Sequence, residues 1–332
     1  MQPTVVCLGE ALALLPDVPT GEPAAPDMAR AAGAEVNVAL GLAGAGTPVA
    51  WIGRLGDDAL GAVVLSELEG RGVDVGAVEI DPALPTGCYA KTVAIGPDGE
   101  PSSRMHYRRA GSAAAGMGPG FLARPAVRER LAAAAFVHVS GITAALSQPC
   151  AKLMEALLAA PRNGRAVFDV NWREQMWPSG DPRVVVGLAG LADVVLVGGD
   201  EARRVFGTDD PAALRRLLPA PELLIVKDGA DRALAAARDG SVVAQPALAV
   251  EVLEPVGAGD AFAAGLLTGL VRGEPIERCL RRGHLAAAAV LTVPGDSATP
   301  LPAAMLGRLL DSTEREWADV RVSAAGVKEV TR

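Results

Sequence analysis

Short, continuously apolar runs recur along the chain and alternate with longer segments whose apolar residues follow helical spacing. Residues 35–45 show the helical kind, with Val36, Leu40 and Ala43 on one face. Strands that are apolar throughout are buried on both faces, and their alternation with helices favours a parallel sheet covered by helices on both sides. The strands predicted in this way are residues 4–9, 49–52, 136–140, 166–170, 194–197, 223–227 and 233–237, and the clearest helices are 35–45, 61–71, 260–271 and 275–291.

Two segments interrupt this alternation. Residues 86–95 and 104–107 read as strands joined by the Gly-Pro-Asp-Gly turn at 96–99, which predicts a hairpin that forms a subdomain or lid. Residues 240–252 are expected to add a hairpin at the edge of the main sheet. From about Ser312 the sequence turns polar, and residues 313–332 are expected to form a frayed tail.

Composition narrows the class of protein. The 332 residues suffice for one large α/β domain or two smaller ones, and the net charge of −8 argues against nucleic acid or an anionic membrane as the main partner. The four cysteines are far apart and form no CxxC pair, so they fit buried, reduced thiols. No secretion signal is visible, and no apolar run reaches the length of a membrane span. A cytoplasmic location is therefore expected.

The segment from Glu254 to Phe262 is the most informative stretch of the chain. Gly257, Ala258 and Gly259 carry little or no side chain, so their N–H groups and the following helix N-terminus can approach an anion closely. Asp260 comes next, where a carboxylate beside a bound phosphate is electrostatically awkward unless it handles a proton. A base next to an anion hole suits phosphoryl transfer to a hydroxyl. An ordinary Gly-rich turn before a helix is the alternative.

This segment resembles the C-terminal signature of the PfkB (ribokinase-like) carbohydrate kinases. The N-terminal stretch from Ala32 to Ala39 (AGAEVNVA) is similar to the first signature of the same family, and the GRLGDDALG loop and the Lys-Asp-Gly turn at 227–229 follow in the family's order. The resemblance runs from about residue 4 to 310. It implies a ribokinase-like three-layer α/β sandwich over residues 1–312, with a central, mainly parallel sheet and a small β-sheet lid built from segments near 10–34 and 86–112. ATP and Mg²⁺ are the implied cosubstrate and cofactor.

Within the family, the chain is most similar to 2-keto-3-deoxygluconate kinases. The residues that carry this likeness are Gly33-Ala34-Glu35-Val36-Asn37, Tyr89, Tyr107-Arg108-Arg109-Ala110-Gly111-Ser112, Ser140-Gly141-Ile142-Thr143 and Asp169-Val170-Asn171-Trp172-Arg173. The resemblance implies that the product is 2-keto-3-deoxy-6-phosphogluconate and that Asp260 is the base. It also implies that substrate is bound by Gly33, Ala34, Asn37, Tyr89, Tyr107, Arg109 and Arg173.

The physical chemistry of the two arginines agrees with a sugar-acid substrate. A guanidinium binds a planar carboxylate with two parallel hydrogen bonds, whereas a neutral hexose needs no such cation. Alternatively, Arg109 is a solvated lid residue and Arg173 is an ion-pair partner of Asp169. The two tyrosines both fall in the predicted lid, where they either line the sugar site or simply reflect β-propensity.

The expected nucleotide site is less well marked. Lys227, Gly229, Gly257 and Gly259 are expected to contact ATP, with the adenine between the 227–231 turn and the helices near 279–289. The family's N-x-x-E, linked to Mg²⁺, reads here as Gly198-Gly199-Asp200-Glu201. Glu201 fits a metal role, but Gly198 stands where the family has Asn and so lacks its amide group. Asp200 either compensates for this amide or caps a helix. Glu254 replaces the family's usual Asp, which leaves activation by K⁺ open.

Two other functions remain open from the sequence. One is a kinase for fructose or another neutral sugar, which would leave Arg109 and Arg173 without an anionic partner. The other is a catalytically weak relative that only binds sugar or nucleotide, which Gly198 and Glu254 suggest and the complete 257–260 motif disfavours. A homodimer through the lid is a further expectation, because a small hairpin sheet buries one face poorly on its own.

Overall fold

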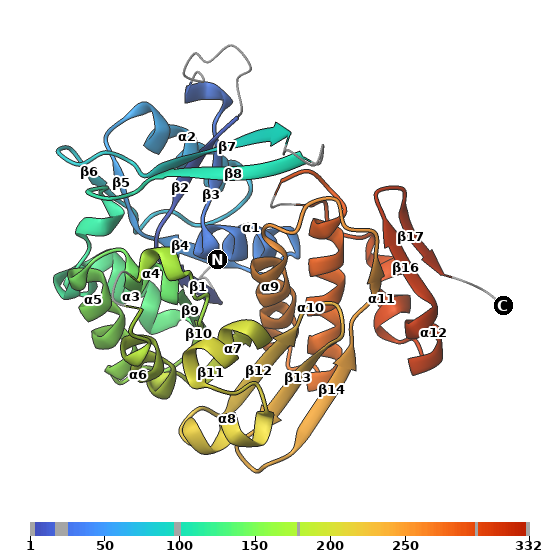
Figure 1. Ribbon diagram of the computed structural model, residues 1–332. Helices are drawn as coiled ribbons and strands as arrows, with labels where there is room; N and C mark the ends of the chain where they lie inside the picture. Colours follow the sequence, from blue (N-terminus) through green and yellow to red (C-terminus); the bar gives the residue numbers. More distant parts are fainter. Residues whose placement is uncertain (1–3, 17–25, 96–100, 178–179, 296–297, 330–332) are drawn as a thin grey trace.

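The computed structural model describes residues 4–16, 26–95, 101–177, 180–295 and 298–329 (Figure 1). The predicted turn at 96–99 lies outside these residues. Among the described residues, no helix combines the length and apolar composition needed to cross a bilayer.

An eight-stranded sheet forms the centre of the molecule. In spatial order the strands are β14 (Val242–Pro246), β13 (Arg232–Ala237), β12 (Leu223–Asp228), β11 (Val194–Gly198), β10 (Arg165–Asp169), β9 (Phe136–Ser140), β1 (Val5–Leu8) and β4 (Val49–Ile52). The six strands from β12 to β4 are parallel, which confirms the predicted sheet type, whereas β13 pairs antiparallel with both β12 and β14. β13 reverses direction because only a short turn separates it from β12, with no crossover helix.

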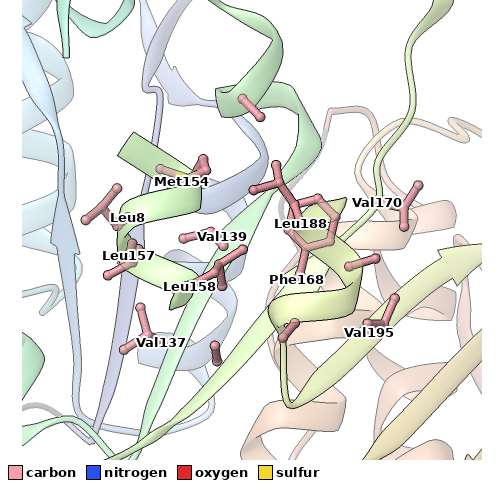
Figure 2. Packing of buried hydrophobic residues seen from close by; sticks show 14 of the residues in the cluster. Leu8, Val137, Val139, Met154, Leu157, Leu158, Phe168, Val170, Leu188 and Val195 are labelled. Atoms are coloured by element: carbon pink, nitrogen blue, oxygen red, sulfur yellow. The ribbon is translucent and has the colours of Figure 1, made fainter. Parts of the chain in front are cut away.

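Helices cover both faces of this sheet, so the molecule has three layers. Along β1, Val5 and Cys7 pack into one apolar cluster while Val6 and Leu8 pack into the other, because alternate side chains point to opposite faces. Figure 2 shows part of the second cluster, where Phe168 of β10 meets Leu188. One layer contains α1 (Ala34–Gly44), α2 (Ala59–Gly70), α9 (Ala258–Val271) and α10 (Ile276–Leu291); the other contains α3 (Pro125–Ala133), α4 (Gly141–Ala145), α5 (Gln148–Ala159), α6 (Arg183–Leu191), α7 (Gly199–Phe206) and α8 (Pro211–Leu217).

A separate four-stranded sheet lies next to α2, on the side of the molecule that carries β1 and β4 (Figure 1). Its strands come from the two segments named above, 10–34 and 86–112. Leu12, Ala32 and Tyr89 form its buried side. Its order is β3 (Arg30–Ala32), β2 (Leu12–Leu15), β7 (Cys88–Ile95) and β8 (Pro101–Arg108).

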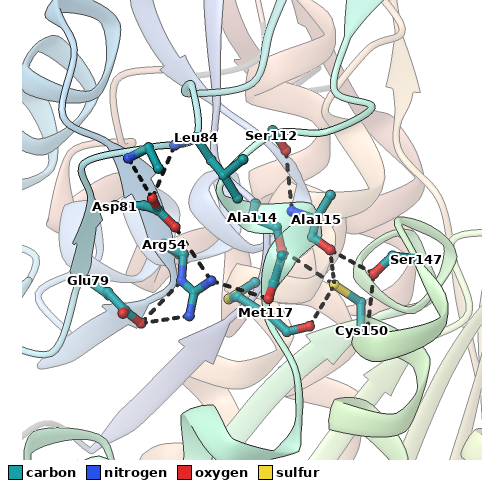
Figure 3. Close-up of polar contacts among 12 residues, drawn as sticks. Arg54, Glu79, Asp81, Leu84, Ser112, Ala114, Ala115, Met117, Ser147 and Cys150 are labelled. Atoms are coloured by element: carbon teal, nitrogen blue, oxygen red, sulfur yellow. Dashed lines mark hydrogen bonds and ion pairs between the residues drawn. The ribbon is translucent and has the colours of Figure 1, made fainter.

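Polar contacts fix the loops beneath this sheet (Figure 3). Arg54 starts β5 (Arg54–Gly56), which pairs with β6 (Glu79–Asp81), and its guanidinium forms an ion pair with Glu79 at 3.1 Å. The same guanidinium donates to the Gly116 carbonyl at 3.2 Å. The Cys150 thiol of α5 lies 3.4 Å from the carbonyls of Ala114 and Met117. These bonds connect the GRLGDD loop to the helical layer below it.

The prediction of a frayed tail over residues 313–332 was wrong for its described part. The segment folds into α12 (Glu314–Asp319) and a hairpin of β16 (Val320–Ser323) and β17 (Gly326–Glu329). β16 pairs with β15 (Ala249–Val250), so the predicted 240–252 hairpin contributes only β14 to the main sheet. Trp317 is 1% exposed and anchors a small apolar cluster after α11 (Ala303–Leu310). A few well-placed apolar residues outweighed the polar average of the segment.

Candidate active site

One cavity of about 750 Å³ lies where the carboxyl ends of the parallel strands meet the small sheet and the start of α9. Ligands of open α/β sheets bind at this edge because loops there converge from several strands. The residues expected to contact substrate or nucleotide, the 257–260 motif and Glu201 all line this cavity. They are Gly33, Ala34, Asn37, Tyr89, Tyr107, Arg109, Arg173, Glu201, Lys227, Gly229, Gly257, Ala258, Gly259 and Asp260.

The start of α9 presents backbone N–H groups to the cavity. Gly257 precedes the helix with a φ of 83°, a left-handed conformation that glycine adopts without steric cost. Ala258 and Gly259 follow in the first turn, where the N–H groups have no partner within the helix. The helix is 14 residues long, so its positive end adds to the attraction for an anion.

Asp260 faces the same cavity from the first turn of α9. Its Oδ2 accepts a hydrogen bond of 2.9 Å from Nδ2 of Asn37 on α1. Although the residue keeps some accessible surface toward the cavity, the surrounding protein removes most of the hydration of its carboxyl group. This burial raises the pKa of Asp260 to about 7, with a smaller contribution from the charge of Asp169, and outweighs the opposing effect of Asn37. A carboxyl group with this pKa is suited to accept a proton near neutral pH.

Lys227 brings a positive charge next to the helix N-terminus. It lies on β12, and its ammonium group forms an ion pair of 2.9 Å with Asp169 at the end of β10, two strands away in the sheet. Burial alone lowers the pKa of Lys227, but the carboxylates of Asp169 and Glu201 outweigh it and raise the pKa. A side chain on Gly259 would begin 3.7 Å from the Lys227 nitrogen, so the ammonium group lies beside the first turn of α9.

The opposite end of the cavity is built from side chains. Tyr89 and Tyr107 stack with ring centroids 5.1 Å apart, and the Arg109 guanidinium lies 4.3 Å from the Tyr107 ring centroid. Arg109 Nη1 is 3.5 Å from a carboxyl oxygen of Glu10. The Arg109 side chain is only 17% exposed, which argues against the alternative of a solvated lid residue.

Glu10 was not predicted as a site residue, yet it lines the cavity at this end. Gly33 approaches it so closely that a side chain there would begin 2.8 Å from the Glu10 carbonyl oxygen, and its φ of 123° also favours glycine. Burial raises the pKa of Glu10 to about 7, against the lowering effect of Arg109. Its position directly after the first buried strand was the available signal.

Arg173 and Glu201 pair with each other across the cavity wall at 3.1 Å. The alternative partner of Arg173, Asp169, is instead taken by Lys227. The second carboxyl oxygen of Glu201 accepts a hydrogen bond of 2.9 Å from the Gly198 N–H at the start of α7. Glu201 therefore caps this helix itself, whereas the exposed Asp200 side chain pairs with Arg203 and does not line the cavity.

Asn171 is a second cavity residue without a predicted role. It is the one non-glycine residue with positive φ, 39°, in the part of the chain that the structure describes. Its Nδ2 lies 3.5 Å from Oδ1 of Asp260, on the side opposite Asn37. Strained backbone concentrates at functional sites, where it fixes a side chain in one direction. The family-like run around it in the sequence was the signal.

The remaining part of the cavity is apolar. It extends between the turn after β12 and α10, the region expected to hold the adenine, and its lining residues include Leu248, Val250, Val252, Ala287 and Leu291. His284 also lines it; burial lowers its pKa to about 4, and its Nε2 lies 3.0 Å from the Gln245 carbonyl oxygen. Among the described residues, no group of three or more His, Cys, Asp or Glu side chains could hold a metal ion.

Comparison with known proteins agrees with this geometry. The chain is 34% identical over 280 residues to the 2-dehydro-3-deoxygalactonokinase of Haloferax volcanii, covering 82% of this chain and 85% of that protein. It is 32% identical over 277 residues to the 2-dehydro-3-deoxygluconokinase of Thermoproteus tenax, covering 82% of each.

Solved structures show the same architecture. A PfkB protein from Polaromonas sp. JS666 superposes with a TM-score of 0.72 at 30% identity, over 89% of this chain and 98% of that one. A fructokinase from Vibrio cholerae, bound to fructose, ADP and calcium, gives a TM-score of 0.77 at 25% identity, over 93% and 99%. The family model for pfkB carbohydrate kinases matches residues 3–304. Because this match spans most of the chain, the chain belongs to the pfkB family of carbohydrate kinases.

Proposed function

We propose that this protein transfers the γ-phosphoryl group of ATP to the terminal hydroxyl of 2-keto-3-deoxygluconate, also named 2-dehydro-3-deoxygluconate. The product is the 6-phosphate. The observation that carries the proposal is a single cavity with Asp260 at a helix N-terminus on one side and a half-buried arginine, Arg109, on the other. The relatives named as kinases of 2-dehydro-3-deoxy sugar acids support the same substrate class.

The chemistry follows from the groups around Asp260. The substrate hydroxyl oxygen bonds to the γ-phosphorus while the bond to the departing ADP oxygen breaks, and the hydroxyl proton passes to the Asp260 carboxylate. Asn37 donates to Oδ2 of this carboxylate and so orients it. The N–H groups from 257 to 260 and the Lys227 ammonium stabilise the negative charge on the transferring oxygens.

The residues present fit Mg²⁺ carried by the nucleotide. Mg²⁺ keeps several waters and uses one or two carboxylates together with substrate phosphates, so a site built by one acidic side chain suffices. Glu201 lines the cavity and would face the ion, directly or through water, on exchanging its contact with Arg173. When bound, the metal shields the phosphate charges. Activation by K⁺ is not part of the proposal, because Glu254 stands where the family usually has Asp.

The two arginines differ in what they would hold. The charge of Arg173 lowers the pKa of Asp260, although burial and Asn37 matter more, so Arg173 lies within electrostatic range of the phosphoryl-transfer end. Arg109 lies with Glu10 and Tyr107 at the other end. A sugar acid that presents its terminal hydroxyl to Asp260 has its carboxylate at its opposite end. We therefore assign the carboxylate to Arg109 and the γ-phosphate to Arg173.

The rest of the cavity suits the adenine of ATP and closure by the small sheet. The apolar end beside α10 would take the adenine, with Gly229 in the turn that borders it. Closure of the small sheet would exclude water and so prevent wasteful hydrolysis of ATP. The exposed Tyr107, at 47%, lies on this sheet and leaves a lid-mediated homodimer as an expectation.

A neutral-sugar kinase is the second candidate. The fructokinase from Vibrio cholerae has the same fold, and the ion pair of Arg109 with Glu10 already neutralises the arginine. A binding-only relative is disfavoured, because Asp260, the α9 N-terminus and Lys227 all face one cavity.

An ADP-coupled assay with Mg²⁺ and ATP tests the proposal. We expect kcat/KM for 2-keto-3-deoxygluconate to exceed that for fructose, ribose and adenosine by at least about 100-fold, since a charged contact discriminates strongly. Preference for fructose would keep the kinase and discard the sugar-acid assignment. Absence of ADP with every sugar would favour the binding-only alternative.

A further inference from the structure

Glu10 lines the end of the cavity that contains Tyr89, Tyr107 and Arg109, here called the sugar end. It lies between the Gly33 turn, whose backbone contacts it closely, and Arg109 on the small sheet. The residue is 1% exposed, and it lines the cavity. Within the described residues, neither of its carboxyl oxygens has a hydrogen-bond partner. A buried carboxyl group left in this state is costly, so a partner from a ligand would stabilise it.

The backbone of Glu10 is held rigidly. Its N–H donates 3.0 Å to the Thr143 hydroxyl, which in turn donates 2.8 Å to the buried carboxylate of Glu35. Glu35 also accepts from the N–H and hydroxyl of Ser140 at 3.0 and 2.8 Å. The adjacent Gly9 leaves no room for a side chain, since a Cβ there would lie 2.2 Å from Glu35. This network fixes where the Glu10 side chain enters the cavity.

Arg109 does not satisfy Glu10. The 3.5 Å separation exceeds the range of a charge-assisted hydrogen bond, and Arg109 Nη1 is directed to the Met176 sulfur at 2.8 Å. The carboxyl group of Glu10 can accept several hydrogen bonds, and Glu10 lines the cavity that a sugar would fill. The pair therefore offers a cation for a carboxylate and, next to it, an acceptor for hydroxyl groups.

We infer that Glu10 is a substrate-binding, specificity-determining residue whose carboxyl group accepts a hydrogen bond from the C4 or C5 hydroxyl of the sugar acid held by Arg109. The inference rests on the proposed function, because that function places the sugar at this end of the cavity. The expected ligand is a polyhydroxy acid in which a hydroxyl lies within a few bonds of the carboxylate. Sugars without such a hydroxyl would leave Glu10 unpaired and bind weakly.

The test is the sugar KM and the calorimetric Kd of the Glu10→Gln variant of the full chain. Gln keeps the size but loses the charged acceptor, so we expect KM and Kd for 2-keto-3-deoxygluconate to rise about 10- to 100-fold. ATP affinity should stay within about twofold, because Glu10 lies away from the nucleotide end. Analogues that lack the C4 or the C5 hydroxyl supply the decisive comparison: for one of them, wild type and Glu10→Gln should bind alike.

The matched control is Glu274→Gln, which disrupts a buried pair with Arg282 outside the cavity lining and should leave the sugar KM unchanged. An unchanged or lower sugar KM in Glu10→Gln would overturn the inference, and a lower KM would mean that Glu10 only neutralises Arg109. An equal loss for every analogue would also overturn it, since that pattern indicates a structural role. Failure of the wild-type protein to bind or phosphorylate any sugar would instead contradict the proposed function, and the inference with it.

Discussion

The two ends of the cavity are built in different ways. The phosphate end, which we define as residues 257–260 with Lys227, comes from one helix N-terminus and the end of the adjacent strand β12. The sugar end, defined as Glu10, Gly33, Tyr89, Tyr107 and Arg109, combines residues from the first strand's end, the turn before α1 and the small sheet. Backbone groups dominate the first end, and charged or aromatic side chains dominate the second.

This difference separates chemistry from specificity. Backbone N–H groups at a helix end bind any phosphate, so the phosphate end can serve every kinase with this architecture. Side chains carried by separate segments can change one at a time, so the sugar end can be tuned to a substrate. Substitutions at the first end should therefore reduce kcat with all sugars, whereas substitutions at the second should change which sugar is used.

The largest effect is expected at Asp260. Asp260→Asn removes the proton acceptor while keeping the side-chain size, so kcat should fall about 10³- to 10⁴-fold with every sugar, and ATP affinity should stay nearly unchanged. Steady-state kinetics and calorimetric ATP titration measure the two quantities. Asp239→Asn, on an exposed turn, is the control. If Asp260→Asn retained kcat, Asp260 would not be the base, and the phosphate end would not carry the chemistry.

The C-terminal segment extends the comparison to a third region. Trp317 is buried, donates 2.9 Å to the Pro246 carbonyl, and packs in a cluster that includes the cavity residues Leu248 and Ala288. Trp317→Ala should lower the free energy of unfolding by about 3–5 kcal/mol, as for other buried aromatic truncations. In the folded variant, KM for ATP should rise while KM for the sugar stays constant. Denaturant titration measures the free energy of unfolding, and steady-state kinetics measure the two KM values. Trp317→Phe should lose less free energy of unfolding than Trp317→Ala. A rise in sugar KM alone would contradict the separation of the two ends.

Acidity should affect the phosphate end in a defined direction. Burial raises the pKa of Asp260 to about 7, and only the ionised form accepts the proton. We expect kcat/KM to fall about tenfold per pH unit below about pH 7. A pH–rate profile with sugar and ATP measures this fall. A plateau that persists down to about pH 5 would show that the base has an ordinary carboxyl pKa.

The same shift predicts a smaller effect on stability. Because the folded-state pKa of Asp260 is raised, its contribution to stability is present below its unfolded pKa and is lost as the pH rises through about 7. Asp260→Asn avoids this loss, so it should be more stable than wild type by about 1–3 kcal/mol near pH 8, with the difference shrinking toward pH 5. Urea unfolding at both pH values measures it. Equal stability at both would mean that the carboxyl group stays well hydrated.

The sequence predicted the phosphate end more completely than the sugar end, for physical reasons. Residues 257–260 follow one another in the sequence, and small residues directly before a helix are typical of anion-binding sites. The sequence did not predict that Glu10 and Asn171 line the cavity, because this depends on which segments meet and a lone Glu after a strand carries no local pattern. The C-terminal fold was missed because Trp317 and Val320 are buried by contacts with β15 and α10 that lie far away in the sequence.

The main fold was predictable for a complementary reason. Strands such as β4 and β11 are apolar on both faces, so consecutive apolar residues in the sequence indicate their burial. Helix positions followed from spacing, but the start of α2 was placed two residues late, at 61, because the cap at Asp58, which accepts from the Gly61 N–H, was not considered. The antiparallel return of β13 required knowledge of the turn geometry at Gly229, where φ is 50°.

The most direct test of the central claim is the ratio of kcat/KM for 2-keto-3-deoxygluconate to that for fructose in wild type, Arg109→Ala and Arg173→Ala. The account predicts a high ratio in wild type and a fall of about 10- to 100-fold in Arg109→Ala, because a charged contact to the carboxylate is lost. Arg173→Ala should lower kcat for both sugars and leave the ratio nearly unchanged. A ratio that is the same in wild type and Arg109→Ala would contradict the assignment of a sugar-acid carboxylate to this end of the cavity.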